Sequence, residues 1–296
     1  MPKAKSNGIE LEFETFGDRS GRPLLLVMGL GSQLIGWSDE VLKQLVDKGH
    51  FVIIFDNRDM GLSSKIEEAG VPDTREMMKA LSRGEEISVP YTFYDMGDDA
   101  VGLLDFLDIK KAHICGHSLG GAIAETIAIS HPERLLSLIL ISAPTYNPNL
   151  PQPKPEITSL MRTPSDAGRT AYVEKEVQIS RAISGPGFPF DEEWVRQVTE
   201  RAYDRSYYPD GTSRQFLARL AIKNQQLPLR SIKAPTLVIH GEEDPLLPVE
   251  NALDAAEKIT GAELMIIKGM GHYPPHRGPW PQIIEAIARH TNKVTS

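Results

Sequence analysis

The 296-residue sequence contains a single cysteine, Cys115, so the chain can form no intramolecular disulfide and its fold must depend on an apolar core. Cys115 lies in an apolar run, where a small buried hydrophobic side chain is a simpler interpretation than a reactive thiol. Hydrophobic residues make up 41% of the chain. This is enough material for one large core, or for a core with an inserted cap.

The sequence also lacks an excess of basic residues and any long apolar run. Lys and Arg number 32 against 40 Asp and Glu, which gives a formal net charge of −8 and argues against nucleic acid or an anionic membrane as the main partner. No apolar run approaches the roughly 20 residues that span a bilayer, and the N-terminus lacks the apolar segment of a secretory signal. We therefore expect a cytoplasmic protein with no membrane partner, as a monomer or a small homo-oligomer.

Short apolar runs alternate with amphipathic segments along most of the chain. The expected buried strands span residues 23–28, 51–55, 112–115, 136–141, 236–240 and 263–267. The expected helices span residues 37–45, 96–107, 122–130, 250–258 and 280–290. Such alternation predicts an α/β fold with a mostly parallel central sheet and helices on both faces.

The alternation stops between residues 144 and 229. Prolines are frequent at the start of this segment, and helical periodicity persists at 171–183 and 191–203 with little sign of strands. We predict a helical cap at 144–229, inserted into a core made of residues 1–143 and 230–296. Its aromatic residues either line a pocket or form the cap's own small core: Phe188, Phe190, Trp194, Tyr203, Tyr207, Tyr208 and Phe216.

The strongest motif is the run from Gly116 to Gly121, which reads Gly-His-Ser-Leu-Gly-Gly and lies between an expected strand and an expected helix. A nucleophilic serine on a sharp strand-to-helix turn needs residues without side chains two positions before and two positions after it. Gly116 and Gly120 meet this requirement around Ser118. Ser118 is therefore the candidate nucleophile.

A serine hydroxyl needs an adjacent base, and His272 in the loop Gly-Met-Gly-His before the last expected helix is the candidate. His240, His276 and His290 are weaker candidates, because they lie before the acidic loop, in a proline-containing loop and on a surface helix. The third member should be a carboxylate after the penultimate strand. Asp244 is our choice over its neighbours Glu242 and Glu243, which we interpret as solvated loop charges.

The oxyanion of a tetrahedral intermediate needs fixed hydrogen-bond donors. We expect one donor to be the amide of Leu119, just after the nucleophile, and the other to be the amide of Leu30 in the glycine-containing loop after residues 23–28. An ordinary turn is the alternative interpretation of that loop. Met28, Gly29 and Met270 are expected at the substrate pocket, whose rim would be apolar.

These motifs together resemble the capped α/β-hydrolase superfamily, and more narrowly the aclacinomycin methylesterase-like group. The narrower resemblance rests on residues 27–31, Val-Met-Gly-Leu-Gly, and 56–63, Asp-Asn-Arg-Asp-Met-Gly-Leu-Ser. Many members of the superfamily have histidine where this chain has Met28 and glycine where it has Asp59. The resemblance implies the α/β-hydrolase fold and cofactor-free hydrolysis through an acyl-enzyme.

We therefore expect a serine hydrolase of the carboxylesterase type that acts on a neutral, fairly hydrophobic small-molecule ester. A lactonase, a C–C bond hydrolase or a perhydrolase on the same three residues remains open, as does a receptor-like protein with slow or no turnover. No metal site is expected, because Pro274 and Pro275 between His272 and His276 exclude the helix that an i, i+4 zinc pair needs. The glycines at 29 and 31 lack the third glycine of a dinucleotide-binding motif.

Overall fold

The computed structural model describes residues 3–70, 73–162, 168–223, 227–274 and 276–294, and within them it contains one sheet of eight strands in the order β1-β2-β4-β3-β5-β6-β7-β8. The strands are β1 (Lys3–Ser6), β2 (Ile9–Phe16), β3 (Arg22–Val27), β4 (His50–Phe55), β5 (Ala112–His117), β6 (Leu135–Ile141), β7 (Thr236–Gly241) and β8 (Glu263–Ile267). From β4 to β8 every neighbouring pair is parallel. The prediction of a mostly parallel sheet is confirmed.

The two N-terminal strands were not predicted. β1 pairs with β2, and β2 pairs with β4, both in the antiparallel sense. The alternation of Ile9, Leu11 and Phe13 with glutamates is the period-two signal that could have identified β2. Leu11 and Phe13 are buried in the core, as that pattern requires.

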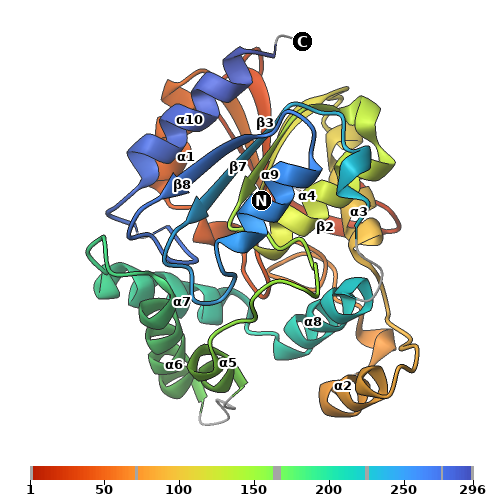
Figure 1. The fold of residues 1–296 in the computed structure, drawn as a ribbon. Helices are drawn as coiled ribbons and strands as arrows, with labels where there is room; N and C mark the ends of the chain where they lie inside the picture. The colour runs from red at the N-terminus through yellow and green to blue at the C-terminus, as the bar shows by residue number, and fades with distance from the viewer. Residues whose placement is uncertain (1–2, 71–72, 163–167, 224–226, 275, 295–296) are drawn as a thin grey trace.

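Helices cover both faces of the sheet (Figure 1). α1 (Asp39–Asp47) and α10 (Trp280–Asn292) lie on one face, and α3 (Phe93–Phe106), α4 (Leu119–Ser130) and α9 (Glu250–Lys258) lie on the other. Each face has its own apolar cluster, with Leu42 and Ile283 in one and Phe93 and Ile123 in the other. The sheet therefore separates two packed layers of helices. The loops at the carboxyl ends of its strands are free to carry functional groups.

In the described part of the segment between β6 and β7 there are four α-helices, and α2 (Thr74–Ser82) follows β4. The four are α5 (Pro155–Arg162), α6 (Gly168–Ile183), α7 (Glu192–Ser206) and α8 (Pro209–Lys223). In Figure 1 these helices and α2 gather beyond the carboxyl ends of β7 and β8. Short 3-10 helices occur at η1 (Leu34–Gly36), η2 (Glu67–Ala69), η3 (Pro132–Arg134) and η4 (Leu229–Ser231). We refer to α5–α8 and their connections as the cap, although its boundaries at 144 and 229 stay a prediction.

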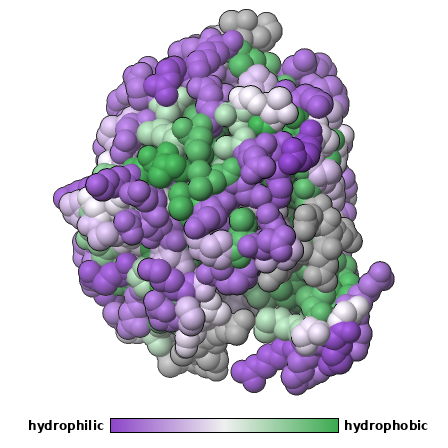
Figure 2. All heavy atoms as spheres, viewed as in Figure 1, coloured by the Kyte–Doolittle hydropathy of each residue, from purple (hydrophilic) through white to green (hydrophobic). Residues whose placement is uncertain are grey.

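Most of the face shown in Figure 2 is hydrophilic, apart from an apolar area over the β8 edge of the sheet. Leu264 and Ile266 on β8 are 41% and 36% exposed. Among the described residues, no helix combines the length and the apolar character needed to cross a bilayer.

Candidate active site

The turn between β5 and α4 holds Ser118 in a strained backbone conformation, with φ of 54° and ψ of −123°. A Cβ on Gly116 would lie 2.1 Å from the carbonyl oxygen of Gly120, and a Cβ on Gly120 would lie 2.2 Å from that of Val27. Both contacts are with backbone, so neither can be relieved by a rotamer change. The sequence expectation that both positions require glycine agrees with this packing.

Ser118, His272 and Asp244 form one chain of hydrogen bonds. His272 Nε2 lies 2.9 Å from Ser118 Oγ, and His272 Nδ1 lies 2.7 Å from Asp244 Oδ2. Because a carboxylate accepts, Nδ1 donates to Asp244, and Nε2 is left to accept the serine proton. Residues 154 and 28 positions apart in sequence thus meet at the carboxyl edge of the sheet.

The Asp244 carboxylate is fully engaged at its second oxygen as well. Oδ1 accepts from the amides of Leu246 and Leu247, both at 2.8 Å, and His240 Nε2 approaches Oδ2 at 3.3 Å. Burial raises the pKa of this carboxyl, but the charge and hydrogen bonds of His272 and His240 outweigh it and hold the pKa well below the usual range. Asp244 is therefore an anion that is hydrogen-bonded to the His272 ring.

The amides of Leu30 and Leu119 are the expected oxyanion donors. Leu119 is the first residue of α4, so its amide has no partner within the helix. Leu30 N–H has no protein acceptor among the described residues. A Cβ on Gly29 would lie 3.3 Å from Ser118 Cβ, which shows that the loop after β3 abuts the serine. The donor role of these two amides stays a prediction.

His117 lies beside the three residues and was given no role by the sequence. Its Nε2 donates to the His272 carbonyl oxygen at 3.2 Å, and the two rings are 5.3 Å apart between centroids. The ring also packs edge-on against Tyr273. Burial lowers the pKa of His117 to about 3, so it remains neutral near pH 7. Only its place within the Gly-His-Ser motif could have drawn attention to it.

The loop that carries His272 is hydrogen-bonded to the cap. The His272 amide donates to the carbonyl oxygen of Ile183 at 2.7 Å, and the Gly271 amide donates to that of Ser184 at 2.9 Å. Gly187 in turn donates to the carbonyl oxygen of Gly269 at 2.8 Å. Three backbone bonds thus join residues 183–187 to residues 269–272. Nothing in the sequence pattern indicated this contact.

The other histidines and carboxylates of the sequence analysis have separate surroundings. His276 stacks on Trp194 of α7 with centroids 4.7 Å apart and a 1° angle between the rings, and its Nδ1 lies 3.4 Å from Asp191 Oδ2. His290 contacts Glu263, and its Nδ1 is 3.0 Å from the carboxylate. Glu242 and Glu243 are exposed, as expected of solvated loop charges.

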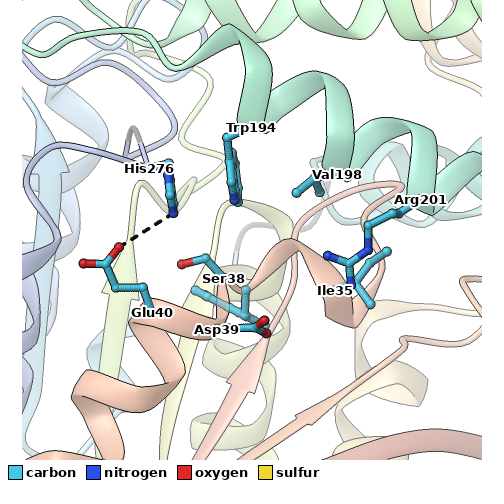
Figure 3. Close-up of a pocket in the computed structure, with 9 residues that line it drawn as sticks. Ile35, Ser38, Asp39, Glu40, Trp194, Val198, Arg201 and His276 are labelled. Atoms are coloured by element: carbon cyan, nitrogen blue, oxygen red, sulfur yellow. Dashed lines mark ion pairs between the residues drawn. The ribbon is translucent and has the colours of Figure 1, made fainter.

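His276 and Trp194 also border a cavity between the cap and the core (Figure 3). In that view the His276 ring points toward Glu40, whose carboxylate lies 3.8 Å from Nε2. The cavity is lined by Ile35, Trp37, Ser38, Asp39, Glu40, Trp194, Val198, Arg201 and His276. Ser118, His272 and Asp244 do not line this cavity. His276 therefore belongs to the contact between the cap and the core, away from these three residues.

Two of the three residues expected at the substrate pocket have side chains within the core. Met28 is 2% exposed and Met270 is unexposed, and both belong to the apolar cluster on the α1 and α10 face. Gly29, by contrast, lies against Ser118. Pocket lining by the two methionines stays a prediction. Among the described residues there is no cluster of three or more histidine, cysteine or acidic side chains that could hold a metal ion.

Comparison with known proteins places the chain in a family. The family model described as alpha/beta hydrolase fold matches residues 22–279. Among curated proteins, the chain is 29% identical to the rhodomycin D methylesterase of Streptomyces peucetius, over 97% of this chain and 96% of the relative. It is 27% identical to a putative carbamate hydrolase of Variovorax paradoxus, over 93% and 91% of the two chains.

Solved structures agree on the fold. The chain is similar to the 2-hydroxy-6-oxo-6-phenylhexa-2,4-dienoate hydrolase of Rhodococcus sp. strain RHA1, with a TM-score of 0.75, 20% identity and coverage of 98% and 97% of the two chains. The expected resemblance to a methylesterase group agrees with the first relative. The family match spans most of the sequence and includes the strands from β3 to β8 and the serine turn. The chain belongs to the alpha/beta hydrolase fold family and is a hydrolase of that family.

Proposed function

We propose that this protein is a carboxylic-ester hydrolase with Ser118 as nucleophile, His272 as general base and Asp244 as the carboxylate that orients it. The observation that carries the proposal is the unbroken contact chain, 2.9 Å from Ser118 Oγ to His272 Nε2 and 2.7 Å from His272 Nδ1 to Asp244 Oδ2. The geometry matches the order of roles in a serine hydrolase. A relative named as a methylesterase supports the ester class.

In the first half of the reaction, His272 Nε2 takes the proton of Ser118 as Oγ attacks the ester carbonyl carbon. The amides of Leu30 and Leu119 stabilise the developing oxyanion. Collapse of the intermediate breaks the carbon–oxygen bond of the ester, and the alcohol leaves with the proton from His272. Water then attacks the acyl-enzyme with His272 as base, and the acid and free serine are released.

The substrate we infer is a neutral, fairly hydrophobic small-molecule ester, since the residues that carry the two expected oxyanion donors beside Ser118, Leu30 and Leu119, are apolar. We also propose a cytoplasmic location and a monomer or small homo-oligomer. Size-exclusion chromatography with light scattering tests the oligomeric state. Cell fractionation tests the location.

The central test is Ser118→Ala, measured with an activated short-chain ester. Loss of the nucleophile is expected to lower kcat by roughly four orders of magnitude or more. A fluorophosphonate probe should label the wild type and leave the variant unlabelled. Activity of the variant close to that of the wild type would refute the proposal.

A substrate panel separates the alternatives that share these residues. Esters, lactones, C–C bond substrates and hydrogen peroxide with an acyl donor should be compared by kcat/KM, with esters expected to rank first. A protein that neither turns over any substrate nor reacts with the fluorophosphonate would be the receptor-like alternative.

A further inference from the structure

A fully buried glutamine joins the cap to the loop after β3. Gln215 on α8 has no exposed surface, and its Oε1 accepts from the Gly31 amide at 3.0 Å. Its Nε2 donates to the carbonyl oxygen of Arg58 at 3.1 Å. One side-chain amide thus links α8 to the loop of the expected oxyanion donor and to the loop after β4.

The Gly31 amide belongs to a tight turn that contains Leu30. The Ser32 amide donates to the Gly29 carbonyl oxygen at 3.2 Å, and Gly31 has φ of +70°. Leu30 is not among the described non-glycine residues with positive φ, so the turn is of type II. Rotation of the central peptide, which carries the Gly31 N–H, would convert it to another turn type. A bond to this N–H therefore holds the central peptide in one orientation and fixes the position of the turn, on which the Leu30 amide of the preceding peptide lies.

α8 is itself firmly anchored to the core beside Gln215. Arg214 is 1% exposed and forms a two-pronged ion pair with Asp59, with both distances at 2.9 Å. A Cβ on Gly31 would lie 3.1 Å from Thr212 Cγ2, so the turn also packs directly on α8. The acceptor presented by Gln215 therefore has a fixed position relative to the sheet.

We propose that Gln215 is a positioning residue that holds the oxyanion turn from the cap side, so that the Leu30 amide faces the substrate carbonyl oxygen. This inference rests on the proposed function, because the donor role of Leu30 is part of it. A misaligned donor loses more in the transition state, where the oxygen carries charge, than in the ground state. Removal of the Gln215 acceptor should therefore lower kcat and leave KM nearly unchanged.

The test compares Gln215→Met with Gln215→Glu, since both replacements keep the length of the side chain. Methionine removes the acceptor for Gly31. A glutamate at this fully buried position is expected to be neutral, so that it keeps an oxygen acceptor for Gly31 and an O–H donor for the Arg58 carbonyl oxygen. The Met variant should lose roughly ten- to hundredfold in kcat on an activated ester, as expected for a displaced catalytic group. Its affinity for a trifluoromethyl ketone, which forms an oxyanion adduct, should fall by a similar factor. The Glu variant should recover most of both losses.

Gln33→Met is the matched control. Gln33 is also a buried glutamine between the cap and the core, and it donates to the carbonyl oxygens of Ala202 and Ser206 on α7. Unlike Gln215, it makes no hydrogen bond with Gly31. The control should keep its kcat. An equal loss in Gln33→Met would mean general loosening of the cap and would overturn the inference, as would wild-type kcat in Gln215→Met.

Two further measurements keep the inference and the proposed function apart. If Gln215→Met does not fold, Gln215→Asn replaces it, because its amide is one methylene too short to reach Gly31. If Ser118→Ala is inactive while the folded Gln215 variants match the wild type, only the positioning role fails. If Ser118→Ala is active, the proposed function fails first.

Discussion

The two loops that carry Ser118 and His272 are supported by different parts of the molecule. The serine turn is packed within the core, where its flanking glycines lie against the backbone of β3 and of α4 itself. The histidine loop is held from the other side, by three backbone hydrogen bonds from residues 183–187 of the cap. The cap is therefore part of the scaffold that supports the candidate site. This difference also predicts that damage to the two supports has different consequences.

The largest effect is expected on the core side, from Gly120→Ala. The new Cβ would lie 2.2 Å from the Val27 carbonyl oxygen and 2.7 Å from that of Met28, so the backbone of β3 or α4 would have to move. We expect destabilisation by more than about 3 kcal/mol and loss of activity. Urea unfolding followed by circular dichroism measures this. Gly84→Ala is the control for backbone strain without a clash: no atom lies within 4 Å of its Cβ, but its φ is +78°, so it should lose only about 1–2 kcal/mol and keep its activity. A stable and active Gly120→Ala variant would show that the turn is not held by the core.

The next effect concerns the anchor of α8, through Arg214→Met. This change leaves the Asp59 carboxylate buried and unpaired, which should cost about 3–5 kcal/mol of unfolding free energy. Asp59 has φ of 69°, a conformation that glycine adopts freely. The double variant Asp59→Gly with Arg214→Met should therefore recover much of the loss. If the double variant is no more stable than the single one, the ion pair is not the cause.

A smaller effect is expected on the cap side of the histidine loop, from Gly187→Ala. The added Cβ would lie 2.6 Å from Gly269 Cα and would push the histidine loop away from the cap. Because the change displaces His272 without touching it, kcat should fall by roughly ten- to hundredfold while the protein stays folded. Steady-state kinetics with an activated ester measures this. Gly168→Ala is a cap position with φ of +84° and open space around its Cβ, so it adds backbone strain without a clash and should have wild-type kcat.

The smallest effect expected of a single substitution is on the pH dependence of stability, and it should originate in the core. Burial is the main cause that lowers the pKa of His50 to about 4, and of His113 and His117 to about 3. All three lie on core strands, and an unfolded histidine titrates near 6.5. Between pH 6.5 and these values the unfolded chain binds more protons. The unfolding free energy should therefore fall as pH falls, by up to about 1.4 kcal/mol per pH unit for each histidine.

Urea unfolding between pH 7 and pH 5 measures this slope. His113→Asn keeps a donor near Ser137, to which the His113 ring is hydrogen-bonded at 2.8 Å, and it removes one titrating group. The slope should become shallower by up to about one third. An unchanged slope would mean that His113 does not contribute to acid unfolding.

The parts of the site that could be predicted from the sequence depend on patterns among residues that are close together in the chain. The glycines at 116 and 120 are set by the turn that Ser118 itself makes, and His272 and Asp244 follow strands whose hydrophobic pattern is local. Parallel strands carry the loops at their carboxyl ends to one edge of a sheet. A parallel sheet is therefore expected to bring Ser118, Asp244 and His272 to the same edge. The antiparallel β1 and β2 were missed although Ile9, Leu11 and Phe13 alternate.

The contacts that support the site from the cap were out of reach of the sequence. Gln215 and Gly31 are 184 residues apart, and a glutamine inside a helix has no pattern that names its partner. The bond from His272 to Ile183 is between backbone atoms, so it leaves no trace in residue type. Met28 and Met270 were expected at the pocket from their neighbours in sequence, while their side chains lie in the core cluster.

The sequence by itself determined the layered sheet, the strained serine turn and the residues able to form a nucleophile, base and acid. These depend on periodicity and on glycine spacing, which act over a few residues. Only the tertiary structure decided that the cap holds both the histidine loop and the turn at Leu30. Buried hydrogen-bond donors and acceptors need partners in the folded protein. Which groups of distant segments become partners is decided only when the cap packs on the core.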